Sequence, residues 1–197
     1  MFVQIIEGRT TDGKALMERG ESWQQELRPG AKGYLGVTAG VTADGRAVTI
    51  ARFESEDAAR ANSERPEQGA WWAETAKLYD GEPTFTESSD VTLWMGGGSN
   101  DAGFVQVMKT TGADRAKLEE MDKAFEPYTS ARPDLLGGLR IWTGKDSCID
   151  VAYFTSEAEA RDGEKAEMPP EVQELMAGMQ EGMGQLEYFD LTEPQVR

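Results

Sequence analysis

The amino-acid sequence contains one pattern twice, and this internal repeat limits the fold more than any other feature. Four landmarks occur in the same order in both halves of the chain: FVQII at 2–6 and FVQVM at 104–108, Arg-Pro at 28–29 and 132–133, FESEDAAR at 53–60 and FTSEAEAR at 154–161, and DVT at 90–92 and DLT at 190–192. The offsets are 102, 104, 101 and 100 residues (104 − 2, 132 − 28, 154 − 53, 190 − 90). Such a small drift in spacing indicates a duplicated unit whose copies differ in loop length.

The repeat predicts the domain organisation. The first copy is expected over residues 1–95 and the second over residues 104–197. Residues 96–103 (GGGSNDAG) lie between them and have the composition of a flexible linker. A chain of 197 residues has room for two small units of this size.

Each copy predicts the element order strand, helix, strand, strand, helix, strand. Residues 2–8 alternate as a strand does, and the helix that follows is expected to stop at the Arg-Pro pair, because proline disfavours helical geometry in the residue before it. A hairpin turn is expected at 44–45 (Asp-Gly) in the first copy and at 144–146 in the second. Ser55 and Ser156 are expected to cap the next helices.

The second half of each copy is expected to hold a broken helix and a final strand. Pro66 in the first copy, and the prolines at 169–170 in the second, break the helix and restart it. The restarted helix of the second copy carries an apolar stripe, which predicts a buried face: Val172, Leu175, Met176, Met179 and Met183. The last strands are expected near residues 83–93 and 185–192.

This order is the βαββαβ arrangement of a ferredoxin-like unit, an α+β fold with both helices on one face of an antiparallel sheet. Strand alternation predicts which residues share a face. We expect the apolar set to face the helices: Leu35, Val37, Ala39, Val41, Val48 and Ile50 in the first copy, and Leu139, Ile141, Ile149 and Val151 in the second. The opposite face is then a mixed set: Tyr34, Gly36, Thr38, Ala47, Thr49, Ala51 and Phe53, and Gly138, Arg140, Trp142, Cys148, Asp150, Ala152 and Phe154.

The mixed face of the second copy predicts two cross-strand pairs. Pairing of the strands across the 144–146 turn places Trp142 opposite Cys148 and Arg140 opposite Asp150. An ion pair is therefore expected beside an aromatic ring and a thiol. A face of this composition suits the lining of a small cavity, or two sheets packed face to face.

Composition excludes several classes of chemistry. The chain has no histidine, so histidine general bases, Ser-His-Asp triads and histidine-ligated zinc or haem are excluded, and no metal site is predicted. The net charge of −16 argues against nucleic acid and anionic membranes as partners, because both are polyanions. Plain solubility also explains this charge. With a single cysteine, Cys148, and no signal peptide or membrane span, a cytoplasmic protein is expected.

The two FVQ-type opening strands and the helix starts at 53–60 and 154–161 resemble the dimeric α/β-barrel superfamily, and most of all its antibiotic-biosynthesis-monooxygenase branch. The resemblance covers nearly the whole chain, twice. It implies that the two antiparallel sheets face each other and enclose a barrel. One chain would then form a pseudo-dimeric α/β barrel, as a monomer or as a homodimer of it.

The resemblance also implies an activity. Members of this branch include cofactor-independent oxygenases in which the deprotonated aromatic substrate supplies the electrons to oxygen, and the protein supplies an enclosing pocket and hydrogen-bond donors. The haem-degrading and peroxidase-like members depend on a histidine ligand, which this chain lacks. No cofactor is therefore expected.

Candidate catalytic residues follow from the same resemblance. An asparagine and a tryptophan near the second helix carry the activity in such enzymes, and Asn62 with either Trp71 or Trp72 is similar in type. Asn62 and Trp72 are taken as the candidates. The spacing departs from the family pattern, because it is longer and contains Pro66. Tyr34 completes the candidate catalytic set. The second copy has Gly163 in place of Asn62 (163 − 62 = 101), so only the first copy is expected to keep such a site.

A wider set of side chains is expected to bind a ligand: Trp71, Thr38, Thr49, Phe53, Arg140, Trp142, Asp150 and Phe154. Structural roles compete with these assignments. Trp71 and Trp72 lie on helical stripes about 100° apart, so one is expected in the core and the other at an edge. Asn62 also suits a helix C-terminus, because asparagine tolerates left-handed geometry. Asp150 would be a weak base beside Arg140, which lowers its pKa.

Three functions remain open from the sequence alone. The first is a cofactor-independent monooxygenase acting on an aromatic or polyketide-like small molecule in a barrel pocket. The second is a protein that binds a small hydrophobic molecule without turning it over. The third is a filled barrel that acts as an interaction scaffold.

Overall fold

The computed structural model describes residues 1–165, 170, 173 and 184–197. The chain divides into two compact units. Unit 1 comprises residues 1–91 and 191–197, and unit 2 comprises residues 92–190. Each unit contains a five-stranded sheet with helices, so the predicted α+β, ferredoxin-like class is confirmed for both. The face-to-face packing of the two sheets stays a prediction.

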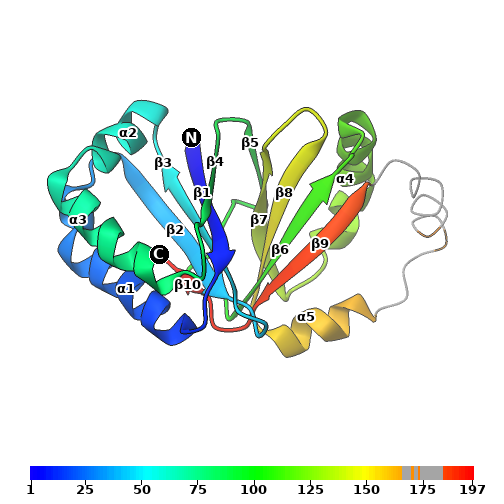
Figure 1. Cartoon of the computed structure of the whole chain (residues 1–197). Helices are drawn as coiled ribbons and strands as arrows, with labels where there is room; N and C mark the ends of the chain where they lie inside the picture. Colours follow the sequence, from blue (N-terminus) through cyan, green and yellow to red (C-terminus); the bar gives the residue numbers. More distant parts are fainter. Residues whose placement is uncertain (166–169, 171–172, 174–183) are drawn as a thin grey trace. The chain divides into compact units, whose positions relative to one another are not determined.

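Unit 1 has the strand order β10-β2-β3-β1-β4. Its strands are β1 (Phe2–Arg9), β2 (Tyr34–Val41), β3 (Arg46–Phe53), β4 (Thr84–Ser88) and β10 (Gln195–Val196). Its helices are α1 (Gly13–Glu26), α2 (Glu56–Ser63) and α3 (Pro66–Thr75), with short 3₁₀ turns at Arg28–Gly30 and Ala76–Leu78. Figure 1 shows α1 and α3 running side by side along one face of this sheet.

Unit 2 repeats this order with the strand sequence β5-β7-β8-β6-β9. Its strands are β5 (Val91–Trp94), β6 (Phe104–Thr111), β7 (Leu135–Trp142), β8 (Ser147–Phe154) and β9 (Gln185–Leu191), and its helices are α4 (Arg115–Thr129) and α5 (Glu157–Glu164). The apolar stripe expected at Val172, Leu175, Met176, Met179 and Met183 lies outside the described residues.

In each sheet the fifth strand is supplied by the segment that follows the last strand of the other unit. After β4 the chain leaves the sheet of unit 1, and β5 joins unit 2 beside β7. After β9, β10 joins unit 1 beside β2. The single strand expected over 83–93 is therefore two strands in two sheets. Unit 1 therefore ends at residue 91 and takes in residues 191–197, whereas the sequence repeats were expected over residues 1–95 and 104–197.

The predicted helix starts at Ser55 and Ser156 and the predicted stops before the two Arg-Pro pairs are confirmed, whereas the break expected at 169–170 borders residues outside the described part of the chain. The Ser55 hydroxyl accepts a hydrogen bond from the backbone N–H of residue 58 at the start of α2, and Ser156 does the same for residue 159 in α5. Helices α1 and α4 both end before their Arg-Pro pairs. These local signals depend on neighbouring residues alone, which explains why the sequence predicts them well.

The predicted choice of sheet face is wrong for most of the hairpin residues. In unit 1, Phe53 packs with Ala59 of α2, and in unit 2, Trp142 and Cys148 pack with Leu118 of α4. The mixed set therefore meets the helices. The residues expected there are instead on the far face: Val48 and Ile50 in β3, and Leu139, Ile141, Ile149 and Val151 in unit 2. Within β2, a bulge between Tyr34 and Gly36 shifts the alternation by one residue, so Val37, Ala39 and Val41 share the face of Tyr34.

The physical reason for this error is that both faces of each sheet are buried. On the far face of unit 1, Val48 is 1% exposed and Ile50 is 0% exposed. The more apolar face of a sheet can be identified as the buried one only when the other face is in contact with water. Because both faces are buried here, the apolar residues do not show which face packs against the helices. Leu35, at the bulge, is 50% exposed.

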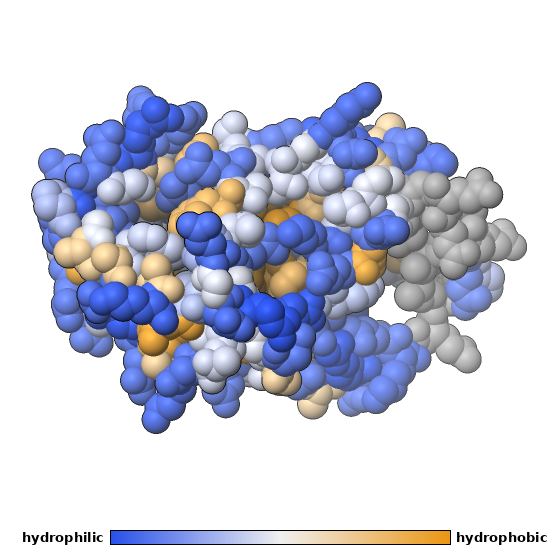
Figure 2. All heavy atoms as spheres, viewed as in Figure 1, coloured by the Kyte–Doolittle hydropathy of each residue, from blue (hydrophilic) through white to orange (hydrophobic). Residues whose placement is uncertain are grey.

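The surface of the described chain is mainly polar. The face drawn in Figure 2 is covered mostly by hydrophilic residues, with apolar residues in small groups. Among the described residues, no helix is both long enough and apolar enough to cross a membrane.

Candidate active site

Unit 1 contains a cavity of about 130 Å³ between its sheet and its helices. The sheet contributes one wall, α1 a second, and α3 with the end of α2 a third. The lining residues are Gln4, Ile6, Leu16, Met17, Gly20, Trp23, Gln24, Tyr34, Val37, Ala39, Gly40, Thr49, Ala51, Phe53, Asn62, Gln68, Trp71, Trp72, Thr75, Tyr79 and Gln195. The wall consists largely of aromatic rings and uncharged amides.

The structure brings together all three candidate catalytic residues, since Asn62, Trp72 and Tyr34 line this cavity. Three of the expected ligand-binding residues join them: Trp71, Thr49 and Phe53. Thr38 does not, because it lies on the far face of the sheet and is 0% exposed. The remaining four, Arg140, Trp142, Asp150 and Phe154, belong to unit 2.

Trp71 and Trp72 both line the cavity, and neither side chain is fully buried. The indole N–H of Trp71 donates to the Ser22 hydroxyl (3.3 Å), which ties α3 to α1. Trp72 packs edge-on against Phe85, with ring centroids 5.1 Å apart. The prediction of one core tryptophan and one edge tryptophan is therefore wrong. A cavity takes the place of the close packing that would have buried one of them.

Tyr34 is held in place by two rings and one amide. Its ring centroid lies 4.8 Å from that of Trp23 in α1 and 5.7 Å from that of Phe53 in β3. The side-chain Nε2 of Gln24 donates a hydrogen bond to the Tyr34 hydroxyl oxygen at 2.8 Å. The hydroxyl therefore acts as an acceptor, and its own hydrogen has no acceptor among the described residues.

The other end of the Gln24 amide is unsatisfied. Its Oε1 atom is shielded from solvent and is the one buried side-chain polar atom of the described chain that lacks a partner. Leaving a buried acceptor unpaired costs about 1–3 kcal/mol, so such an atom in a folded protein calls for an explanation. Gln24 lines the cavity, but this oxygen atom has no surface open to it.

Asn62 is oriented by its neighbour in the break between α2 and α3. Its Oδ1 accepts from the Arg65 guanidinium at 2.9 Å, and the same Nη1 donates to the backbone carbonyl of Leu27 at 3.0 Å. The Asn62 side chain is buried, and its Nδ2 has no acceptor among the described residues. Pro66, which lengthens the spacing to Trp72, starts α3 directly after this arginine.

No Asp, Glu, Lys or Arg lines the cavity, but charged side chains lie directly behind its wall, with Arg65 bonded to Asn62 and Glu87 bonded to Gln4. Burial raises the pKa of Tyr34, only partly offset by the Gln24 hydrogen bond. Burial also raises the pKa of Tyr79, hydrogen-bonded to Thr49, to about 12. Both phenols therefore stay protonated near neutral pH and act as hydrogen-bond donors. Among the described residues no carboxylate, histidine or cysteine group is placed to hold a metal ion.

Sequence reasoning missed the glutamine side chains of this cavity. Gln24, Gln68 and Gln4 line it, and Gln68 Oε1 accepts from the Trp23 indole at 2.6 Å. A signal was present at Gln4, which lies on the same face of β1 as Phe2. Gln24 carries a weaker signal, because it directly follows the buried Trp23 in α1. Polar residues next to an apolar helical stripe are usually solvated, so only the fold shows that these half-buried side chains line a cavity.

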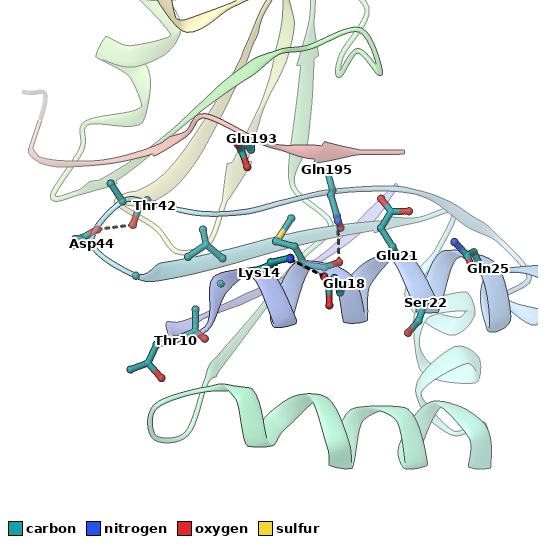
Figure 3. Close-up of a pocket in the computed structure, with 16 residues that line it drawn as sticks. Thr10, Lys14, Glu18, Glu21, Ser22, Gln25, Thr42, Asp44, Glu193 and Gln195 are labelled. Atoms are coloured by element: carbon teal, nitrogen blue, oxygen red, sulfur yellow. Dashed lines mark hydrogen bonds and ion pairs between the residues drawn. The ribbon is translucent and has the colours of Figure 1, made fainter.

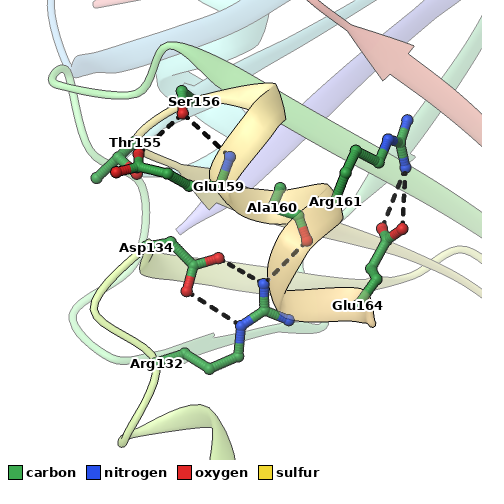
Figure 4. Close-up of polar contacts among 8 residues, drawn as sticks. All are labelled: Arg132, Asp134, Thr155, Ser156, Glu159, Ala160, Arg161 and Glu164. Carbon is green, nitrogen blue, oxygen red and sulfur yellow. Dashed lines mark hydrogen bonds and ion pairs between the residues drawn. The ribbon is translucent and has the colours of Figure 1, made fainter. Parts of the chain in front are cut away.

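The corresponding place in unit 2 is occupied by an arginine (Figure 4). Arg132 pairs with the Asp134 carboxylate and donates to the Ala160 carbonyl of α5 at 3.3 Å. Its guanidinium also lies 5.4 Å from the centre of the Phe154 ring. A side chain at Gly163, the counterpart of Asn62, would overlap this guanidinium. The second copy therefore fills with Arg132 the space that Asn62 occupies in the first.

The predicted cross-strand pairs of unit 2 are confirmed. Arg140 pairs with Asp150 and Trp142 with Cys148 in the β7–β8 register. The Arg140 guanidinium makes two hydrogen bonds to Asp150, at 2.7 and 3.3 Å, and one to Asp122 of α4. These charges pair with one another, so the cluster links α4 to the sheet. Burial raises the pKa of Asp150 by more than Arg140 lowers it, so the expected lowering of this pKa is wrong.

A second hollow of unit 1 is an open groove of about 1050 Å³ between α1, the β2–β3 turn and the C-terminal segment (Figure 3). Its lining mixes charged and polar side chains with the apolar Met17 and Val41. Several of its acidic groups are paired: Glu18 with Lys14 at 3.8 Å, and Glu21 with Arg197 at 2.6 Å. A wide, open groove of this kind buries little of a small molecule, so the narrower cavity between sheet and helices is the stronger candidate.

Solved structures of other proteins match this chain over nearly its whole length. A "putative monooxygenase" from Fusobacterium nucleatum superposes with a TM-score of 0.75 at 10% identity, over 99% of this chain and 91% of that chain. Another from Lactobacillus acidophilus gives a TM-score of 0.71 at 11% identity, over 100% and 98% of the two chains. An anthrone oxidase-like protein gives 0.62 at 8% identity, over 99% and 93%.

These comparisons confirm the predicted resemblance at the level of the fold. The chain has, over its whole length, the tandem ferredoxin-like α+β fold of these monooxygenase-like structures. No protein-family model matches the chain, and no curated protein matches it. At identities of 8–11% the likeness concerns architecture, and the chemistry has to be argued from the cavity itself.

Proposed function

We propose that unit 1 is a cofactor-independent monooxygenase that oxidises a small aromatic molecule inside the cavity between its sheet and helices. The observation that carries this proposal is a set of neutral hydrogen-bond donors on an aromatic-walled cavity. These donors are the Tyr34 hydroxyl, the Asn62 amide and the Trp72 indole N–H, each with a hydrogen that has no acceptor among the described residues. The likeness of the fold to monooxygenase-like structures supports the reaction class.

The reaction requires a substrate that is its own reductant. An activated CH₂ group beside an aromatic ring loses a proton, and the resulting anion passes electrons to O₂. One oxygen atom enters the product as a carbonyl and the other leaves as water (R₂CH₂ + O₂ → R₂C=O + H₂O). Donors aimed at the substrate oxygen stabilise the negative charge that develops there.

The neutral lining makes the rate depend on the acidity of the substrate. Because no carboxylate or amine lines the cavity, the substrate proton passes to water. We expect kcat/KM to rise with pH through the pKa of the substrate, rather than through that of a protein group. Initial rates from pH 6 to 9 with two substrates of different acidity would check this. A profile that stays fixed when the substrate changes would contradict it.

The test of the activity is oxygen consumption with a panel of activated aromatic ketones of one to three rings. Product formation must match the oxygen consumed mole for mole. The Tyr34→Phe variant keeps the ring and removes the donor, and should lower kcat at least about tenfold, given the usual effect of one oxyanion donor. Tyr188→Phe, in an exposed position of unit 2, is the matched control. Thermal unfolding of both variants confirms that they fold. Full activity in Tyr34→Phe would overturn the role of this hydroxyl.

The second candidate function is binding without turnover. The absence of a charged side chain from the lining favours it, because an uncharged wall suits a neutral ligand and supplies no base. Native mass spectrometry of protein purified from its own host distinguishes the two. A retained mass that is released chemically unchanged under oxygen supports binding, and an oxidised ligand supports the enzyme.

A further inference from the structure

We propose that Arg65 is a positioning residue of the candidate site, and that it fixes the Asn62 amide so that the NH₂ group is presented to a ligand in the cavity. Arg65 does not line the cavity, so it acts through Asn62. The cavity then favours a ligand that carries a hydrogen-bond acceptor, such as a ketone oxygen. The inference rests on the site of the proposed function, but it concerns the binding step alone.

The first observation is that the Asn62 amide has one possible orientation. Its Oδ1 accepts a hydrogen bond from Nη1 of Arg65 at 2.9 Å. A guanidinium group has donors and no acceptor, so a reversed amide would place its NH₂ group against another donor. The amide oxygen therefore stays with Arg65, and the NH₂ group is directed elsewhere.

The second observation is that the guanidinium is itself held in place. Nη1 also donates to the Leu27 carbonyl at the end of α1, at 3.0 Å. Two nitrogens of the group pair with the Glu67 carboxylate of α3, at 2.9 and 3.0 Å. The Arg65 side chain is 17% exposed. Because the cation is anchored to both helices, it holds the Asn62 amide in a single position.

The third observation is that the NH₂ group keeps open surface. Nδ2 of Asn62 has no acceptor in the described part of the chain. The one side-chain atom there that is both shielded from solvent and without a partner is Oε1 of Gln24, so Nδ2 is not shielded. Asn62 as a whole is 6% exposed, and the cavity is the hollow that it lines. A ligand acceptor in the cavity supplies the partner that Nδ2 lacks.

The fourth observation is that the two copies obtain a guanidinium at this place from different residues. In unit 2 it belongs to Arg132, which would overlap a side chain at Gly163. The counterpart of Arg132 in unit 1 is Arg28, which is exposed. The guanidinium that would overlap a side chain at Gly30 belongs instead to Arg65. Of the two arrangements, that of unit 1 leaves room for an amide at position 62 and pairs its oxygen.

Two probes that differ in one acceptor test the inference. Acetophenone and ethylbenzene have the same ring and chain length, and the ketone oxygen is the acceptor. We expect Arg65→Met to weaken acetophenone binding at least about fivefold, the usual effect of one hydrogen bond, and to leave ethylbenzene binding unchanged. Calorimetric titration at pH 7 measures both. Equal losses for the two probes would show a merely structural role and overturn the proposal, as would an unchanged affinity for acetophenone.

A matched control and a double variant separate direct from indirect effects. Arg60→Met removes an arginine of α2 whose side chain is 65% exposed, and should change neither affinity. In an Asn62→Ala background, Arg65→Met should cause no further loss of acetophenone binding, because Arg65 acts through Asn62. A further loss in that background would contradict the positioning role.

The Asn62→Asp variant covers the case in which Arg65→Met does not fold. It keeps an oxygen for Arg65 and removes the NH₂ group, so it should weaken acetophenone binding by a similar factor. An unchanged affinity for acetophenone in this variant would overturn the proposal.

The two proposals fail in different ways. Acetophenone binding that depends on Arg65, without any oxygen uptake by the ketone panel, leaves this inference standing and removes the monooxygenase. Oxygen uptake that is the same in Arg65→Met as in the unmodified protein removes this inference and leaves the proposed function.

Discussion

Residue 62 and its counterpart show how a single side chain separates the two copies. In unit 1 the Asn62 amide is held by Arg65 and lines the cavity, and its N–H groups have no acceptor in the described part of the chain. In unit 2 the same position is Gly163, and the guanidinium of Arg132 occupies the space beside it. The capping serines and the Arg-Pro pairs are shared by both copies. The difference between the copies is therefore concentrated in the side chains between sheet and helices.

A prediction at this scale concerns the ion pair of unit 2. Arg140 and Asp150 are 11% and 14% exposed, so Asp150→Leu leaves a nearly buried cation with only the partly exposed Asp122. We expect this variant to lose about 3 kcal/mol of unfolding free energy in urea. The double variant Arg140→Met with Asp150→Leu should lose much less, because no unpaired charge remains. A double variant as unstable as the single one would show that the pair itself, rather than the orphaned charge, sets the loss.

A second prediction concerns the thiol beside this pair. Burial, followed by the nearby Asp150 carboxylate, raises the pKa of Cys148 from 9.0 to about 11. A raised thiol pKa means fewer thiolates at a given pH, by roughly a hundredfold at pH 8, and the thiolate is the reactive form. We expect iodoacetamide to alkylate the folded protein at least about a hundredfold more slowly than the urea-unfolded chain, as measured by mass spectrometry. Equal rates would contradict the burial of Cys148.

At the scale of elements, the exchanged strands β5 and β10 complete each five-stranded sheet. The C-terminal strand is fixed to β2 by reciprocal backbone hydrogen bonds between Val37 and Arg197, at 2.9 and 3.0 Å. The Gln195 side chain donates to the Met17 carbonyl of α1 at 2.9 Å and lines the cavity. Without β10, β2 would become an edge strand, and one wall of the cavity would open.

Deletion of residues 192–197 tests this role. We expect the amides of β2 to lose protection from hydrogen exchange, because their partner strand is gone. The central strands β6 and β8 of unit 2 serve as an internal control and should keep their protection. Unchanged protection in β2 would mean that β10 contributes little to the sheet.

At the scale of the whole molecule, charge is the dominant property. The chain carries 36 acidic and 20 basic residues, and the face in Figure 2 is largely hydrophilic. Many individual charges are paired on the surface, and such exposed pairs contribute little each. The remaining net charge of −16 repels itself in the folded state.

Salt should therefore stabilise the protein. We expect the melting temperature to rise by a few degrees between about 20 and 500 mM sodium chloride, because screening weakens the net repulsion more than it weakens the local pairs. Calorimetry at pH 7 measures this, and an equal osmolality of an uncharged sugar separates screening from solute effects. A melting temperature that falls with added salt would show that the ion pairs outweigh the net charge.

The sequence by itself determined the repeat, the βαββαβ order, the helix caps and the cross-strand pairs of unit 2. Each of these depends on local residue chemistry or on simple alternation, which one chain displays directly. The sequence also supplied the three residues Asn62, Trp72 and Tyr34, which the structure places around one cavity.

Only the tertiary structure decided which sheet face meets the helices, because both faces are buried and a bulge in β2 shifts the alternation. It alone decided that the strands after β4 and β9 change sheets, since strand pairing is a long-range choice that local propensity does not encode. It also revealed the unpaired oxygen of Gln24. Whether a polar atom is satisfied depends on what the folded chain places around it, and no stretch of sequence records that.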